Sequence, residues 1–182
     1  MGMQRTALVA LSALTLAACA EGPAGPGEAP PSPGYEPTPA SATTFDDRDF
    51  AWSTAPGAGV INGLLAYHHG GERYSCQGSD VLLTPETAWS RRRMIILYGS
   101  ANAAAAPVSI VRARTPSAGT GDYARFVRRT ICDENNHFSF TNLPDGGWFV
   151  ITVGRPVDRP GEPLAVTRRV ETHGGVVMAV LS

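Results

Sequence analysis

After residue 45, apolar and polar residues mostly alternate with a period of two, which is the pattern of half-buried β-strands. The clearest runs share β-branched or aromatic residues and lie at 60–67, 80–84, 126–132, 138–140, 148–153, 164–170 and 176–181. Turn residues separate them at His68-His69-Gly70-Gly71, at 133–136, at 142–147 and at 174–175. Short strands spaced by such turns predict an all-β fold, an antiparallel β-sandwich.

One short helix interrupts the strands. Thr84 is suited to the N-cap, Pro85 to the first helical position and Glu86 to the first turn, so the pattern predicts a helix to about Arg92. The run 94–98 fits either a strand or the buried end of that helix. In the less patterned stretch that follows, 108–112 is the one candidate strand.

The first 18 residues differ from the rest of the chain. They comprise basic Arg5, an apolar run of about a dozen residues and the sequence Leu16-Ala17-Ala18-Cys19, which resembles a bacterial lipoprotein lipobox. The resemblance implies cleavage before Cys19 and acylation of its thiol, and Ala20 in the next position implies sorting to the outer membrane. The alternatives are an ordinary cleaved signal and, given the shortness of the run, less favourably a spanning helix.

Residues 19–44 are dense in Pro, Gly, Ala and Ser and have no periodic apolar pattern. Such a segment cannot bury enough surface to offset the entropy of ordering, so we expect a disordered tether. The sandwich domain then occupies residues 45–182.

Two cysteines remain once Cys19 is assigned to lipid. In an oxidising compartment Cys76 and Cys132 are expected to form a disulfide, although sequence alone leaves two separate buried thiols as the alternative. Neither lies in a C-x-x-C pair, which disfavours a metal site.

The block 130–150, with Phe138-Ser139-Phe140 and Leu143-Pro144-Asp145-Gly146, resembles the carboxypeptidase regulatory-like repeat. The openings at 59–65 and 79–85 match its first strands. The resemblance implies a transthyretin-like sandwich that is generally not catalytic. Asn136 stands where the repeat usually has Gly, a position Asn tolerates at positive φ, and about 87–125 is a long insertion.

Composition and motifs exclude several functions. The formal net charge is −1, which argues against a nucleic-acid binder. No nucleophile elbow, zinc-protease pair or phosphate loop occurs, so we predict no catalytic residue and no enzyme. His68 and His69 are adjacent turn residues, and His137 and His173 have no partner by spacing, so we predict neither metal nor cofactor.

The expected function is that of an outer-membrane lipoprotein whose sandwich serves structure or protein interaction. The alternative is a polysaccharide- or peptidoglycan-binding module, and a hydrolase is the weakest hypothesis. Partners are therefore the membrane, through Cys19, and an envelope protein or polysaccharide. Exposed aromatic and cationic side chains are the candidate ligand contacts, namely Trp52, Tyr67, Trp89, Arg91, Arg92 and Arg93. Solvated arginines and buried tryptophans are the competing interpretation.

Overall fold

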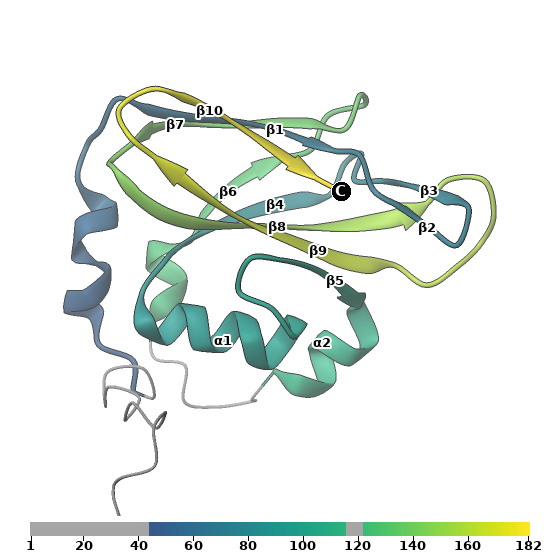
Figure 1. Cartoon of the computed structure of the whole chain (residues 1–182), viewed down its shortest axis with the longest axis horizontal. Coiled ribbons are helices and arrows are strands. Elements are labelled where there is room, and N and C mark those ends of the chain that lie inside the picture. Colours follow the sequence, from purple (N-terminus) through teal and green to yellow (C-terminus); the bar gives the residue numbers. More distant parts are fainter. Residues whose placement is uncertain (1–43, 116–121) are drawn as a thin grey trace, which may run out of the picture. The chain divides into compact units, whose positions relative to one another are not determined.

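A computed structural model of the chain describes residues 44–115 and 122–182 (Figure 1). The predicted signal sequence, 1–18, and all but the last residue of the predicted tether, 19–44, lie outside the described residues. The described helical elements are η2 (Asp47–Thr54), α1 (Ala88–Tyr98), α2 (Val108–Arg114) and η3 (Tyr123–Phe126). The strands are β1 (Gly59–Leu65), β2 (His68–His69), β3 (Glu72–Ser75), β4 (Asp80–Pro85), β5 (Ala103–Pro107), β6 (Arg128–Ile131), β7 (His137–Leu143), β8 (Gly146–Pro156), β9 (Leu164–Thr172) and β10 (Val176–Leu181).

The predicted β-sandwich is confirmed. A three-stranded sheet in the order β10-β1-β7 faces a larger sheet in which β8 is central and pairs with β9, β4 and β3. One detail of the prediction is wrong, because β1 and β10 pair in parallel, with Val60 opposite Val176. The whole domain separates these two strands, so no hairpin turn forces them to be antiparallel.

The larger sheet is antiparallel throughout. From β9 it continues to β5 at one edge, and from β4 to β6 at the other. The β2–β3 hairpin turns at Gly70 and Gly71, whose φ angles of 59° and 78° explain why the sequence has two glycines there.

The core lies between the two sheets and follows the alternation read from the sequence. Phe138 and Phe140 lie on one face of β7 and are both 5% exposed, while Trp148 on β8 has no exposed surface. The Trp148 indole Nε1 donates a hydrogen bond to Thr172 Oγ1 at 3.1 Å, which satisfies the one polar group of this side chain. Gly63 on β1 leaves room for the Phe138 ring, which any Cβ there would overlap.

The helix starts later than predicted. Thr84 and Pro85 end β4, where they pair with Phe149 and Trp148, and Thr87 is the N-cap of α1. Thr87 Oγ1 accepts a hydrogen bond from Ser90 N, and Thr87 N donates one to Ser90 Oγ, so a capping box replaces the predicted cap. Strand pairing outcompeted the local capping signal at Thr84. The ambiguous run 94–98 is the second half of α1.

A second helix occurs where a strand was the candidate. Residues 108–112 belong to α2, and β5 precedes them and pairs with the outer edge of β9. Because β5 already occupies that edge, the chain turns away from the sheet and α2 lies beside α1, where Arg114 Nη1 donates to Leu97 O at 3.2 Å. The insertion predicted at about 87–125 thus contains, in its described part, α1, β5, α2 and most of η3 (Figure 1).

A disulfide joins Cys76 to Cys132, as predicted, with their Cα atoms 5.7 Å apart. Beside it Asn136 has a φ of 66°, so it takes the glycine-like conformation expected from the repeat pattern. Its side-chain Oδ1 accepts hydrogen bonds from Ser75 Oγ and Cys76 N, at 2.7 and 2.9 Å. The asparagine therefore fixes the turn against the disulfide, which glycine would not do.

Candidate functional site

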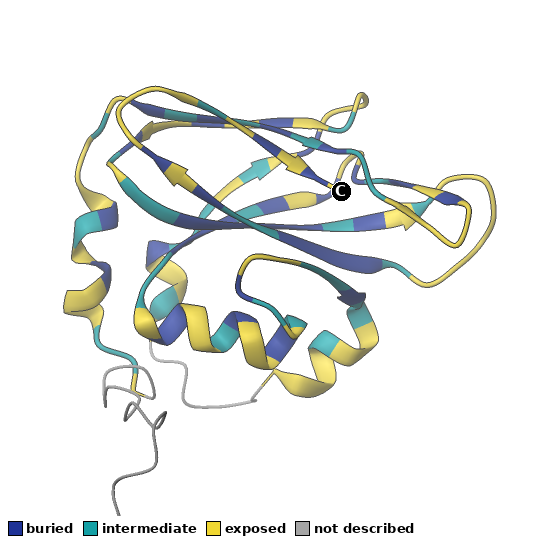
Figure 2. Cartoon of the chain, in the orientation of Figure 1, coloured by how far each residue is buried: buried dark blue, intermediate teal, exposed yellow. Residues whose placement is uncertain are grey.

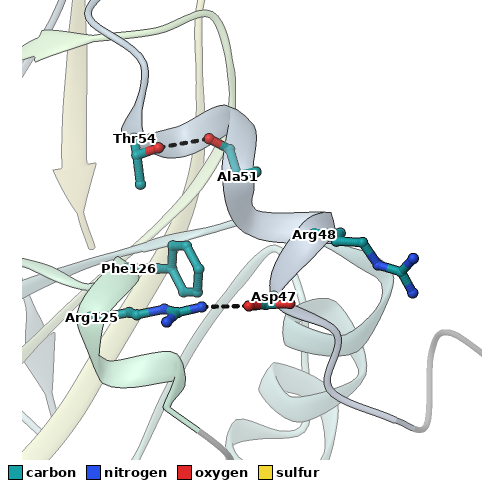
Figure 3. A pocket seen from close by; sticks show the side chains of 6 residues that line it. All are labelled: Asp47, Arg48, Ala51, Thr54, Arg125 and Phe126. Carbon is teal, nitrogen blue, oxygen red and sulfur yellow. Dashed lines mark hydrogen bonds and ion pairs between the residues drawn. The ribbon is translucent and has the colours of Figure 1, made fainter.

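A cleft of about 410 Å³ opens between η2 and η3, at the end of the sandwich where the described chain begins (Figure 3). Charged and hydroxyl side chains occupy its rim and apolar groups its floor. The lining residues are Asp47, Arg48, Ala51, Thr54, Arg125 and Phe126.

Local capping positions the η2 wall of this cleft. Asp46 is the N-cap of η2, and its carboxylate accepts hydrogen bonds from the backbone and the guanidinium of Arg48. The Arg48 side-chain hydrogen bond lowers the pKa of the Asp46 carboxyl, so this cap stays charged near neutral pH. The Arg48 guanidinium points away from Arg125 in Figure 3, so it borders the cleft without closing it.

An ion pair crosses the cleft. Arg125 Nη2 lies 2.6 Å from Asp47 Oδ2, although 78 positions separate the two residues. The Arg125 guanidinium also lies 4.8 Å from the centroid of the Phe126 ring. A planar cation is therefore held between a carboxylate and an aromatic face, with about half of each charged side chain exposed to solvent.

An aromatic cluster supports the floor. We use this name for Phe45, Phe50, Trp89, Tyr123 and Phe126. Phe126 stacks on Phe50 with ring centroids 5.2 Å apart, and Phe45 contacts both Phe50 and Trp89 at 5.3 and 5.4 Å. Four chain segments thus meet under the cleft, which makes its walls rigid relative to α1.

Of the two tryptophans expected to be exposed, Trp89 is buried and Trp52 is half-buried. Trp89 is only 8% exposed, because it is part of this cluster. Trp52 packs edge-on against Trp148 with ring centroids 5.0 Å apart, at the margin of the sandwich core. The Trp89 indole therefore offers no flat face for stacking a sugar ring, and the Trp52 indole is only partly exposed.

The remaining candidate contacts do not converge on one concavity. Tyr67 packs against Tyr74 at the β2–β3 end of the sandwich, with ring centroids 5.6 Å apart, and η2 lies at the other end (Figure 1). Arg91, Arg92 and Arg93 lie on α1. Of these only Arg93 joins the aromatic cluster, with its guanidinium 5.5 Å from the Trp89 ring centroid.

Two further arginines, Arg128 and Arg169, are held in place by hydrogen bonds and ion pairs. The Arg128 guanidinium donates to the carbonyl oxygens of Ser53, Thr141 and Asn142, and its burial lowers its pKa. Arg169 lies 2.6 Å from Glu86, which also pairs with Arg91. Burial alone would lower the pKa of Arg169, but the hydrogen bonds to Glu86 and Glu171 outweigh it, so that pKa is raised. These charges join α1 to the sheet.

In the two described ranges, no group of three or more His, Cys, Asp or Glu side chains is arranged to hold a metal ion. Within the same residues, no helix has the length and apolar character needed to cross a membrane. The groups in the cleft are hydrogen-bond donors and acceptors on an apolar floor, which is suited to a neutral polyhydroxylated ligand.

Sequence reasoning missed Asp47 and Arg125. Each lies in a short polar stretch with no recognisable motif, and only the folding of η2 against η3 brings them together. The one local signal was an aromatic residue within each helical turn, Phe50 in η2 and Phe126 in η3, because a buried ring marks a turn as packed rather than solvated.

The comparisons with known proteins support the fold and nothing finer. Neither protein-family models nor curated proteins give a match. Among solved structures, the chain is similar to a crystal structure from Pseudomonas aeruginosa described as a "putative carbohydrate binding protein", with 21% sequence identity and a TM-score of 0.54. The similarity covers 75% of this chain and 96% of the other. The resemblance to the carboxypeptidase regulatory-like repeat remains a prediction.

Proposed function

We propose that the protein is a lipid-anchored, non-enzymatic envelope protein whose sandwich binds polysaccharide in the cleft between η2 and η3. The observation that carries the proposal is the Asp47–Arg125 pair over Phe126. A carboxylate and a guanidinium side by side bind adjacent sugar hydroxyls, one as acceptor and the other as a two-pronged donor. The carbohydrate-binding description of the similar Pseudomonas structure supports the same class of ligand.

The anchor is the second part of the proposal, and it rests on the lipobox-like sequence ending in Cys19. Several acyl chains on that residue would hold the domain at the outer membrane. A Cys19→Ala variant should be lost from the sedimented outer-membrane fraction.

The cleft is tested by removing its ion pair. Asp47→Ala/Arg125→Ala should weaken binding to purified peptidoglycan or lipopolysaccharide polysaccharide at least tenfold, measured by co-sedimentation and isothermal titration calorimetry. The variant should fold, because exposed ion pairs contribute little to stability.

Arg73→Ala/Asp158→Ala is the matched control. It removes another exposed ion pair, whose charged atoms are 4.0 Å apart, at the β3 end of the sandwich. Equal loss of binding in both variants, or full binding in the Asp47/Arg125 variant, would contradict the cleft as the polysaccharide site.

A second function, protein interaction, has an observation of its own. Strand β10 is an edge strand with an outward row of Val176, Met178 and Val180, of which the first two are more than 60% exposed. Exposed edges are normally protected by charge or proline, and β10 contains neither. Antiparallel pairing of β10 with a second copy about Met178 would place Val176 opposite Val180, so the surface is self-complementary.

Sedimentation velocity tests this second function. Wild-type protein should show a concentration-dependent dimer that Met178→Arg abolishes, while Val157→Arg, at another exposed apolar residue, leaves it intact. A monomer at all concentrations would exclude self-association through β10.

A further inference from the structure

The outer surface of α1 and α2 combines arginines with exposed isoleucines. Ile95 and Ile96 on α1 are 51% and 54% exposed, and Ile110 on α2 is 42% exposed. The opposite side of α1 is buried, because Met94 packs with Phe149 and Ile151 in one apolar cluster. We call this outer surface the helix face (Figure 2).

The charge of the helix face has one sign. The two helices carry five arginines, at positions 91, 92, 93, 112 and 114, and no acidic residue. Arg91 is paired with Glu86, and Arg93 lies over Trp89 and Tyr123. Among the described residues, Arg92 and Arg112 have no ion-pair partner, so their charges are available. Because the whole chain has a formal net charge of −1, the positive charge is local to this surface.

The chain enters the domain beside this surface. The first described residues reach Phe45, whose ring packs 5.4 Å from Trp89 at the start of α1. In Figure 1 the segment before η2 lies on the helical side of the sheets. An anchor on the preceding residues would therefore raise the effective concentration of the domain, and with it of the helix face, at the membrane.

We propose that the helix face docks onto an anionic phospholipid bilayer. Arginines next to exposed branched aliphatic residues are the composition of interfacial helices, in which cations contact lipid phosphates and apolar groups enter the acyl boundary. A soluble polyanion would use the arginines but leave the isoleucines in water, so the combination favours a bilayer. The surface is separate from the cleft and from the acyl anchor on Cys19.

A fluorescent label at Ile96 tests the docking. In the full chain, Ile96→Cys carries an environment-sensitive dye, and Val157→Cys, 46% exposed and just after the end of β8, is the matched control. Cys76 and Cys132 are paired and buried, and the wild-type chain measures any labelling of Cys19. Vesicles contain either phosphatidylcholine alone or phosphatidylcholine with about one-third phosphatidylglycerol.

With anionic vesicles, the dye at position 96 should shift to the blue and be quenched by doxyl-labelled lipid, and the dye at position 157 should do neither. High salt should abolish the effect. Arg92→Gln/Arg112→Gln should raise the lipid concentration needed for half of the shift about 30-fold, while Arg73→Gln/Arg155→Gln should leave it unchanged.

Three results would overturn the proposal. They are equal signals at positions 96 and 157, a blue shift that persists on pure phosphatidylcholine, and a blue shift at position 96 with dextran sulfate but none with vesicles. The last would identify the helix face as a polyanion site. Asp47→Ala/Arg125→Ala should bind vesicles normally, so failure of the polysaccharide proposal and failure of this one are distinguishable.

Discussion

The sandwich core and the aromatic cluster are built in opposite ways. The core is assembled by strands whose alternation is visible in the sequence, as in β7 with Phe138 and Phe140 inside. The aromatic cluster joins five rings from four segments, none of which has a periodic pattern. Element η2 connects the two, because Phe50 enters the cluster and Trp52 packs on Trp148 of the core. The core holds the fold together, and the cluster positions the cleft.

Removing the central indole of the core should cause the largest loss of stability. Trp148→Ala should lower the free energy of unfolding by about 4 kcal/mol, because it leaves a large cavity and removes the hydrogen bond from the indole to Thr172 Oγ1. Urea unfolding followed by circular dichroism measures it. Trp148→Phe should cost clearly less. A loss for Trp148→Ala no larger than for Trp148→Phe would show that the core is not centred on this residue.

Removing the disulfide should have the next largest effect on the core. Cys76→Ala/Cys132→Ala should lower the free energy of unfolding by about 3 kcal/mol, since the bond closes a loop across a sequence separation of 56. Thermal unfolding with and without dithiothreitol measures the change. Reductant should destabilise the wild type to the level of the variant and leave the variant unaffected; a wild type insensitive to complete reduction would refute this role.

A substitution in the aromatic cluster should destabilise the cluster while the sandwich core stays folded. Phe50→Leu should lower the free energy of unfolding by about 1 to 2 kcal/mol, because it removes ring contacts with Phe45, Trp89 and Phe126. Hydrogen exchange should increase in η2 and η3 and stay slow in β8. Phe138→Leu is the control, and it should instead increase exchange in β1 and β7. An equal increase in hydrogen exchange throughout the domain in both variants would mean that the cluster and the core form one cooperative unit.

The smallest effect concerns acid sensitivity at the opposite end of the sandwich. The Glu72 carboxylate accepts hydrogen bonds from Asp158 N and Arg159 Nε at 2.9 and 3.0 Å, which lower its pKa. A lowered pKa stabilises the fold above the unfolded value of about 4.3, and this contribution disappears as the pH falls through the folded value. Glu72→Gln should therefore be less stable than wild type at pH 7 and nearly equal to it at pH 2, in urea titrations at both pH values. A difference in unfolding free energy between variant and wild type that is the same at pH 7 and pH 2 would contradict this linkage.

The local sequence pattern predicted some elements correctly and misplaced others. The alternation in 60–67 predicted β1 and the nearly continuous apolar run 148–153 predicted β8, both to within a few residues. Burial on one face imposes a period of two, and burial on both faces gives a continuous run. The turn at Gly70-Gly71 and the glycine-like conformation of Asn136 were also readable, since few residues tolerate positive φ. Thr84 was misread because its capping chemistry is real but its pairing with Phe149 is stronger.

The sequence by itself determined the all-β class, most of the strand residues that face the core and the lipobox-like start, and it favoured the pairing of Cys76 with Cys132. These depend on local periodicity, turn chemistry and the number of thiols. Tertiary structure alone decided the parallel pairing of β1 with β10, the burial of Trp89, and the meeting of Asp47 with Arg125. Each joins segments far apart in the chain, and no local pattern records which distant segment will supply the partner.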